Sequence, residues 1–415
     1  MSIASVQSVK APAAPRAPAS AARLVSFLGL ALFAASASTT IVGQEAGLAL
    51  AVLGGLALWT QGRLASARAL SLEPAALALV LSWTLSTLFA VEPQASFINM
   101  KKLLLLLIIY VFAWLTEDTR ALERLVKLLV FVGALVAAYG IATYFLKYRL
   151  EEGYRVRATL SSTVTTAGIM LFVLSASLSL ALSKISRRAR VLFTASSLLS
   201  FGCLLLTFTR GAWLGALAAL PVIALKSPSR SRRIVWGSIA VLAVAYLVSH
   251  NVEQRVASQV EERVSSVAQF GEMSIAGRVS MWLTATSIAQ DRPAFGAGLM
   301  DLGRLYETYK RADSMFSSGH MHSNYFHVLA ATGVLGLAAF VWFLYSICGL
   351  LVRNYVQVPR EDRFLKAVCL GSTAGFCAFI LAGIFEWNFG DAEVVSTLFC
   401  VVGLSCASER LRTTA

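Results

Sequence analysis

Apolar stretches separated by short polar ones run along almost the whole chain. Many of them approach the ~20 residues that a helix needs to cross the hydrocarbon core of a bilayer. Together with turn and charge signals, the pattern predicts twelve spans, at 24–42, 46–61, 75–91, 103–115, 125–146, 165–183, 191–207, 211–225, 234–249, 333–353, 364–385 and 393–408. The expected fold is therefore an all-α polytopic membrane protein with about twelve transmembrane helices.

The polar stretches divide the chain into five parts. Residues 1–22, rich in Ala, Pro and Ser, are expected to form a disordered cytoplasmic tail. The first nine spans lie within 23–249, and a long extramembrane segment follows at 250–322. The last three spans lie within 323–408, before a short cytoplasmic tail at 409–415.

Composition supports this class and gives the expected orientation. Hydrophobic residues make up 57% of the chain and charged residues 14%, about half of the ~25% that is usual in soluble domains. With the amino terminus inside, most of the 36 Lys and Arg residues fall in cytoplasmic segments, as the positive-inside rule predicts. Both termini are therefore expected inside, and the net charge of +14 needs no nucleic-acid partner to explain it.

Several basic residues nevertheless fall at the outer ends of spans, where each needs a reason. They are Lys101, Lys102, Lys147, Arg149, Arg155, Arg157 and Arg210. Arg210 lies in "LLLTFTRGAWLGAL", a reversal of only a few residues between two spans. It could be an interfacial anchor, but the tight hairpin restricts its side chain, and Gly211 would let a ligand or a neighbouring backbone come close.

The segment at 250–322 is predicted to form a helical cap on the outer face. "VEQRVASQVEERVSSV" carries a narrow stripe of valines at i, i+4 spacing from 252 to 264, typical of a helix packed on a surface. A second helix is expected in "SIAGRVSMWLTATSIAQ", with Arg278 and Trp282 on one face. "DRPAFGAGLMDLG" should end that helix, because it holds one proline and three glycines.

Three of the four histidines lie in "GHMHSNYFHVLAATGVLG", residues 319–336. His320 and His322 flank Met321, so in an extended segment they point the same way. Ser323 is expected to cap the helix that follows. His327 lies off the face of His322 and is interpreted as a satisfied core histidine. For His322 the alternatives are a functional role and an interfacial contact that holds the loop on the bundle.

Four motifs in chain order resemble the signatures of the O-antigen ligase and Wzy polymerase superfamily. They are "TRGAWLG" (209–215), "GRVSMW" (277–282), "RPAFGAG" (292–298) and "HSNYFHVLAATGVLG" (322–336). The last fits the pattern of the ligases through His322, Ser323, Gly333 and Gly336. The resemblance implies a glycosyltransferase-C-like membrane fold.

It also implies a reaction. Such ligases transfer polysaccharide from undecaprenyl diphosphate to a sugar of lipid A-core, on the periplasmic face of the bacterial inner membrane. They are inverting enzymes that use no metal or other cofactor. The expected partners are the undecaprenyl-diphosphate-linked O-antigen donor, the lipid A-core acceptor and the lipid bilayer.

The residues can supply this chemistry. A diphosphate leaving group chiefly needs its charge neutralised, and no DxD motif for a divalent cation occurs in the chain. Arg210 and Arg278 are predicted to bind the diphosphate, because guanidinium forks match phosphate oxygens and stay charged. His322 is predicted to remove the proton from the acceptor hydroxyl, a task suited to imidazole, or else to bind the diphosphate.

Other residues are possible additions to the site: His320, Lys101, Lys102, Arg155, Arg157 and Glu386. Glu386 and Asp391, in "FEWNFGDAE", could position the acceptor or pair with arginines, and pairing is the favoured interpretation. Two rival functions lie in the same superfamily, a Wzy-type polymerase and a protein O-oligosaccharyltransferase. A secondary transporter is disfavoured, because the predicted spans carry almost no charge in their interiors.

Overall fold

The computed structural model describes residues 21–63, 69–147, 154–226, 275–310 and 319–412, with a few positions between 236 and 244. The predicted span at 234–249, the valine stripe at 252–264 and the amino-terminal tail lie largely or wholly outside these residues. Throughout the described ranges the secondary structure is helical, with no strand.

The helices that correspond to predicted spans are connected by short reversals. They are α1 Ala21–Ser36, α2 Ile41–Thr60, α3 Glu73–Leu88, α4 Pro93–Asn99 continued by η1 Met100–Leu106 and α5 Leu107–Leu115, α6 Thr119–Lys147, α7 Thr163–Ala181, α8 Arg187–Leu206, α9 Arg210–Lys226, α13 Asn324–Gln357, α14 Arg363–Phe385 and α15 Ala392–Arg412. Between them lie α11 Ile275–Asp291, α12 Gly303–Tyr309 and the short η2 Asn388–Gly390. Eight of the described segments are long and apolar enough to cross a membrane, and α1, α3 and α9 are shorter apolar helices. The chain is a polytopic all-α membrane protein.

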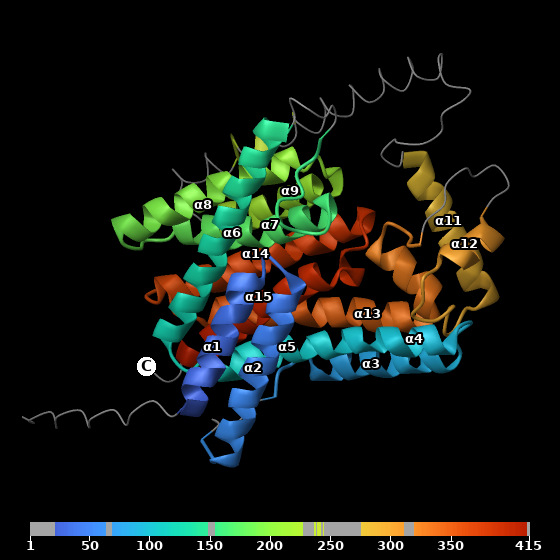
Figure 1. Ribbon diagram of the computed structural model, residues 1–415, viewed down its shortest axis with the longest axis horizontal. Helices are drawn as coiled ribbons and strands as arrows, with labels where there is room; N and C mark the ends of the chain where they lie inside the picture. Colours follow the sequence, from blue (N-terminus) through green and yellow to red (C-terminus); the bar gives the residue numbers. More distant parts are fainter. Residues whose placement is uncertain are drawn as a thin grey trace, which may run out of the picture.

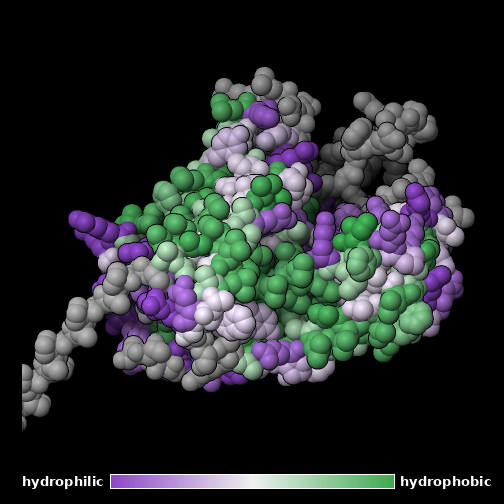
Figure 2. Space-filling view, turned by 60° about the horizontal axis from the view of Figure 1, so that its bottom comes forward, coloured by the Kyte–Doolittle hydropathy of each residue, from purple (hydrophilic) through white to green (hydrophobic). Residues whose placement is uncertain are grey.

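Burial separates central from peripheral helices. In the most apolar window of α7 and of α15, 89% of the residues are buried, against 33% in α2 and in α8. The peripheral helices expose large apolar side chains such as Leu53, Leu104 and Leu198. Figure 2 shows a broad apolar area across the middle of one face, with hydrophilic residues toward its edges. A surface of this kind requires a lipid environment, because it would be left bare to water in a soluble monomer.

The predicted chain reversals are grouped at two opposite ends of the bundle. At one end, called the histidine end, the loops after α1, α3 and α11 meet the loops before α7 and α15. There Val91 N donates to Ala297 O at 2.9 Å and Thr159 Oγ1 donates to Ser38 O at 3.3 Å. This is the grouping that the sequence predicts for the outer segments.

The other end, called the arginine end, collects the segments predicted to be cytoplasmic. Arg23 pairs with Glu117 at 3.2 Å, and Arg363 Nη1 donates to Lys184 O at 3.5 Å. Figure 1 shows α11 and α12 beside the start of α13, while the carboxyl terminus lies at the far side of the bundle.

The tenth predicted span begins earlier than the sequence indicated. We expected it at 333–353, whereas α13 runs from Asn324 to Gln357 with a break at Gly333, where φ is 66° and ψ is −169°. The break is filled by the loop after α11. Val334 N donates to Pro293 O at 2.8 Å, and Gly298 N donates to Ala331 O at 2.7 Å. The segments "RPAFGAG" and "ATGVLG" are therefore hydrogen-bonded to each other at the break in α13.

The cap at the histidine end combines expected and unexpected elements. The helix predicted around Arg278 is α11, which ends at Asp291 just before the predicted breaker. The short helix α12 was not predicted. Its buried Tyr306 packs with Met281 and Met321 in a separate small core, which fastens the loop to α11 and to the chain before α13.

Candidate active site

His322 lies in the chain immediately before α13. Ser323 caps this helix as predicted, because its side chain accepts a hydrogen bond from Phe326 N at 3.5 Å. His322 itself has a φ of 43°, in the left-handed region that residues with a Cβ atom rarely adopt. Such backbone strain is concentrated at functional sites, and here it directs the imidazole away from the helix axis toward the end of α14.

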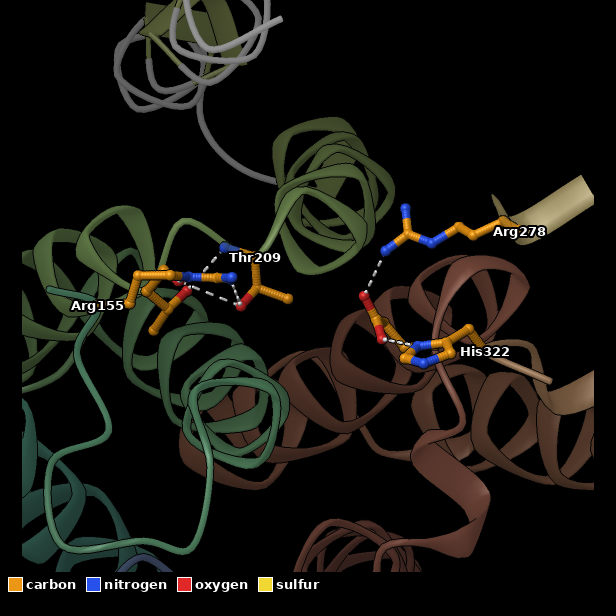
Figure 3. A network of polar contacts seen from close by, with 6 residues as sticks. Arg155, Thr209, Arg278 and His322 are labelled. Carbon is orange, nitrogen blue, oxygen red and sulfur yellow. Dashed lines mark hydrogen bonds and ion pairs between the residues drawn. The ribbon is translucent and has the colours of Figure 1, made fainter. Parts of the chain in front are cut away.

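Glu386 is the centre of the site. Its Oε1 accepts a hydrogen bond from Arg278 Nη2 at 3.0 Å, and its Oε2 lies 3.6 Å from His322 Nδ1. The second distance is too long for a hydrogen bond, but it is short enough for strong attraction between the carboxylate and a protonated imidazole. The Glu386 side chain is only 7% exposed. Figure 3 shows Arg278 from α11 and His322 from the chain before α13 converging from different directions.

Arg210 is brought to the same place by the start of α9. A Cβ atom on Gly211 would lie 3.1 Å from Cγ of Glu386 and 3.3 Å from Cβ of Phe385. Gly211 thus permits the close approach that the sequence suggested, although the neighbour is a side chain of the α14 terminus rather than backbone. Two predicted residues, Arg278 and His322, therefore contact one carboxylate that the sequence had placed only among possible additions, and the residue after Arg210 packs against the same side chain.

Arg155 holds the chain reversal that leads to Arg210. Its Nε donates to Thr207 O at 2.9 Å and its Nη2 donates to Thr209 Oγ1 at 3.3 Å. These contacts hold the reversal between α8 and α9, as Figure 3 shows, and so position Arg210. Arg157 is exposed, and its backbone oxygen accepts from Thr166 Oγ1 at 2.6 Å.

The two lysines of η1 differ. Lys101 is exposed. Lys102, a possible addition to the site, is half-buried, donates to Gly390 O at 3.1 Å and lines the cavity described next. Asp391 departs from the expected pairing with an arginine. Its Oδ1 accepts from Glu393 N at 3.0 Å at the start of α15, and its Oδ2 accepts from Thr165 Oγ1 at 2.5 Å.

A cavity of about 480 Å³ lies beside His320. The ring of His320 lies 4.2 Å from that of His322, centroid to centroid. Burial, and to a smaller extent the neighbouring His322, lower the pKa of His320 to about 4, so this imidazole is neutral at neutral pH. The residues that line the cavity include Trp83, Asn99, Lys102, Asp301, His320, His327 and Trp387.

His327 has a different place from the one expected. It is buried, as predicted, and stacks on Trp387 with ring centroids 3.8 Å apart. However, its Nδ1 has no hydrogen-bond partner, so it is not a satisfied core histidine, and it lines the cavity. Trp83 is only 5% exposed as a residue, and its Nε1 atom also has no hydrogen-bond partner. Nothing in the apolar run around Trp83 indicated that this residue would line a cavity. For Trp387 a signal was present, because it lies between the predicted outer carboxylates Glu386 and Asp391.

Metal ligands are not assembled in the described parts of the chain. No group of three or more His, Cys, Asp or Glu side chains there is placed to hold an ion. All six cysteines carry free thiols.

The comparison with protein families agrees with the geometry. Residues 195–341 match the family model described as O-antigen ligase. The matched segment extends from α8 into α13 and includes Arg210, Arg278, His320 and His322. Glu386 lies beyond it. A search of curated proteins finds no match. The segment that carries these arginines and histidines is therefore similar to the O-antigen ligase and Wzy polymerase superfamily.

Proposed function

We propose that the protein is an O-antigen ligase. It would transfer polysaccharide from undecaprenyl diphosphate to a sugar of lipid A-core, at the periplasmic face of the inner membrane. The observation that carries the proposal is the contact of one buried carboxylate, Glu386, with both Arg278 and His322. It joins a phosphate-binding type of side chain to a proton acceptor at the end of the bundle predicted to face outward.

The donor diphosphate belongs on the arginine side of this site. Arg278 uses one nitrogen for Glu386, and its buried Nε has no hydrogen-bond partner. A guanidinium has five N–H donors, so several remain for phosphate oxygens. Arg210 begins α9, a helix of 17 residues, and the N-terminus of a helix adds further attraction for an anion.

The proton belongs on His322. With Glu386 facing Nδ1, Nε2 is the nitrogen that can accept the proton of the acceptor hydroxyl. The hydroxyl oxygen then forms a bond to the anomeric carbon, while the bond from that carbon to the diphosphate oxygen breaks and the diphosphate leaves with the electron pair. One displacement of this kind inverts the anomeric configuration. Arg210 and Arg278 neutralise the departing charge, so a chelator should not abolish transfer by purified protein.

The acceptor sugar belongs in the cavity beside His320. Its volume of about 480 Å³ falls within the ~300–1,000 Å³ of small-molecule sites. Trp83 and Trp387 supply indole rings, and Asn99 and Asp301 supply polar groups for hydroxyls. His320, which lines the cavity, lies 4.2 Å from His322 between ring centroids, so a sugar in the cavity would lie close to the imidazole of His322.

The decisive test compares purified His322→Ala with wild type, measuring donor binding and ligation separately. Loss of a positioned general base should lower transfer by about 10²–10⁴-fold and leave binding of undecaprenyl diphosphate intact. His320→Ala should have a smaller effect. If His322→Ala ligates normally, the proposed role is wrong. If it fails only because the donor no longer binds, the imidazole is a diphosphate ligand.

A Wzy-type polymerase is the second candidate, because the same superfamily includes both activities. Gene deletion separates them. A ligase deletion should leave complete polymer on the lipid carrier and bare lipid A-core, whereas a polymerase deletion should leave no polymer.

A further inference from the structure

A second large cavity lies at the arginine end, away from the histidines. Its volume is about 790 Å³, and it is lined by residues from the ends of α7, α9 and α13 and from the start of α14. Four of these residues are cations: Lys184, Arg360, Arg363 and Lys366. Among the described residues that line it, none is acidic. A smaller cavity of about 520 Å³ shares Lys184 and Arg363 and adds Arg190.

Two of the cations donate to backbone oxygens in the wall. Lys366 Nζ donates to Tyr355 O at 2.6 Å and to Val358 O at 2.7 Å, and it lies 4.4 Å from the centroid of the Tyr355 ring. Arg363 Nη1 donates to Lys184 O at 3.5 Å. A carbonyl oxygen orients a cation without adding a negative charge to the wall. Like charges around one cavity repel each other, so a bound anion would stabilise the arrangement.

The nearest acidic side chains in sequence do not provide that anion. Glu361 and Asp362 lie in the same loop as Arg360, but both are exposed and neither lines the cavity. The positive-inside tendency accounts for basic residues at this end. It does not account for their convergence on one hollow from two segments that lie far apart in the chain.

The rim of the cavity carries exposed apolar side chains. Leu225 of α9 and Val356 of α13 line it, and they are 72% and 67% exposed. The same hollow therefore offers cations to a phosphate and an open apolar edge to hydrocarbon. A free phosphate ion would need only the first feature, whereas a phospholipid would use both.

We propose that this cavity binds the headgroup of an anionic phospholipid, with its phosphate among Lys184, Arg360 and Arg363 and its acyl chains along Leu225 and Val356. Basic pockets between transmembrane helices are a known type of site for anionic lipid headgroups. The inference does not depend on the proposed transfer reaction, because none of its residues belongs to the site around Glu386.

Binding is measured on full-length protein in a neutral detergent by native mass spectrometry. The probes are phosphatidylglycerol, zwitterionic phosphatidylethanolamine and inorganic phosphate. We expect wild type to retain phosphatidylglycerol in preference to phosphatidylethanolamine. The double variant Lys184→Gln/Arg360→Gln should bind phosphatidylglycerol about 30-fold more weakly, because each cation near a lipid phosphate contributes about a fivefold gain.

The matched control is Arg187→Gln/Arg188→Gln, which removes two exposed cations at the start of α8 that do not line the cavity. It should bind phosphatidylglycerol as wild type does. A third variant, Val356→Ser, should weaken lipid binding and leave phosphate binding unchanged. Thermal unfolding of each variant checks that it is folded, and Lys184→Arg/Arg360→Lys replaces the double variant if the latter does not fold; this charge-keeping pair should retain lipid.

Three results would overturn the proposal. The first is that wild type shows no preference for phosphatidylglycerol. The second is that the α8 control loses as much lipid as the cavity variant. The third is that inorganic phosphate binds as tightly as the lipid and that Val356→Ser changes the binding of neither, which would make the cavity a site for free phosphate.

Discussion

The Nδ1 atom of His322 lies 3.6 Å from Oε2 of Glu386, whose other oxygen accepts a hydrogen bond from Arg278. A carboxylate on that side of the imidazole fixes the ring and leaves Nε2 for substrate. Catalytic hydrogen bonds are often long before substrate binds. We therefore expect the distance between His322 and Glu386 to shorten when substrate is bound. Glu386 therefore joins Arg278 to His322, the two residues to which the proposed function assigns the diphosphate and the acceptor proton.

Glu386→Gln should keep the shape of the side chain and remove its charge. We expect transfer to fall by up to about 10⁴-fold, the loss that follows removal of the orienting carboxylate in a catalytic triad. The melting temperature should also fall, because Arg278 loses its buried partner. Single-turnover transfer and thermal unfolding measure the two effects. Glu393→Gln, at the same end of the bundle and bonded to Ser161, is the control, and equal rates for both variants would remove Glu386 from the mechanism.

Arg210→Lys and Arg278→Lys should each weaken donor binding or transfer by about 10- to 100-fold, because the charge stays while the planar fork is lost. The measurement is the affinity for undecaprenyl diphosphate together with the rate of ligation. Arg304→Lys is the matched control, since Arg304 lies at the same end with its side chain 89% exposed. Near wild-type values for both test variants would identify these arginines as interfacial anchors.

Trp83→Phe should raise the KM for lipid A-core by about 2- to 10-fold, the effect of losing one neutral hydrogen bond, and leave donor affinity unchanged. The indole Nε1 has no partner in the protein, so a sugar hydroxyl is its expected acceptor. Trp342→Phe, on the exposed face of α13, is the control. If wild type ligates and Trp83→Phe has an unaltered KM, the acceptor does not use this cavity.

Stability should depend on pH through His320. Its pKa is about 4 in the folded protein, against 6.5 for an ordinary histidine. Below pH 6.5 the unfolded chain takes up a proton that the folded protein refuses, so stability is lost as the pH falls toward 4. The melting temperature of wild type should drop more steeply over this range than that of His320→Gln. Identical slopes would show that His320 is not buried in its neutral form.

Labelling of single cysteines tests the orientation. In a cysteine-free background, Arg157→Cys should react with a membrane-impermeant reagent added to the periplasm, and Arg188→Cys and Arg360→Cys should react only after the inner membrane is opened. All three positions are exposed. The reverse pattern would place the site around Glu386 in the cytoplasm.

The sequence alone determined the spans, because the length and hydrophobicity of a helix are local properties. It located the segments that became α2, α6, α7, α14 and α15, and it predicted the cap at Ser323 and the helix around Arg278. From its motifs we also predicted Arg210, Arg278 and His322 as site residues, since these residue types suit phosphate binding and proton transfer.

Only the tertiary structure decided what these residues meet. The break at Gly333 was not predicted, because it is stabilised by the loop after α11, through Pro293 and Gly298. The role of Glu386, the cavity beside His320 and the basic cavity around Lys366 likewise depend on contacts between segments far apart in the chain. A hydrophobic pattern records how much of each helix is buried, but the choice of neighbours follows from the packing of all helices together.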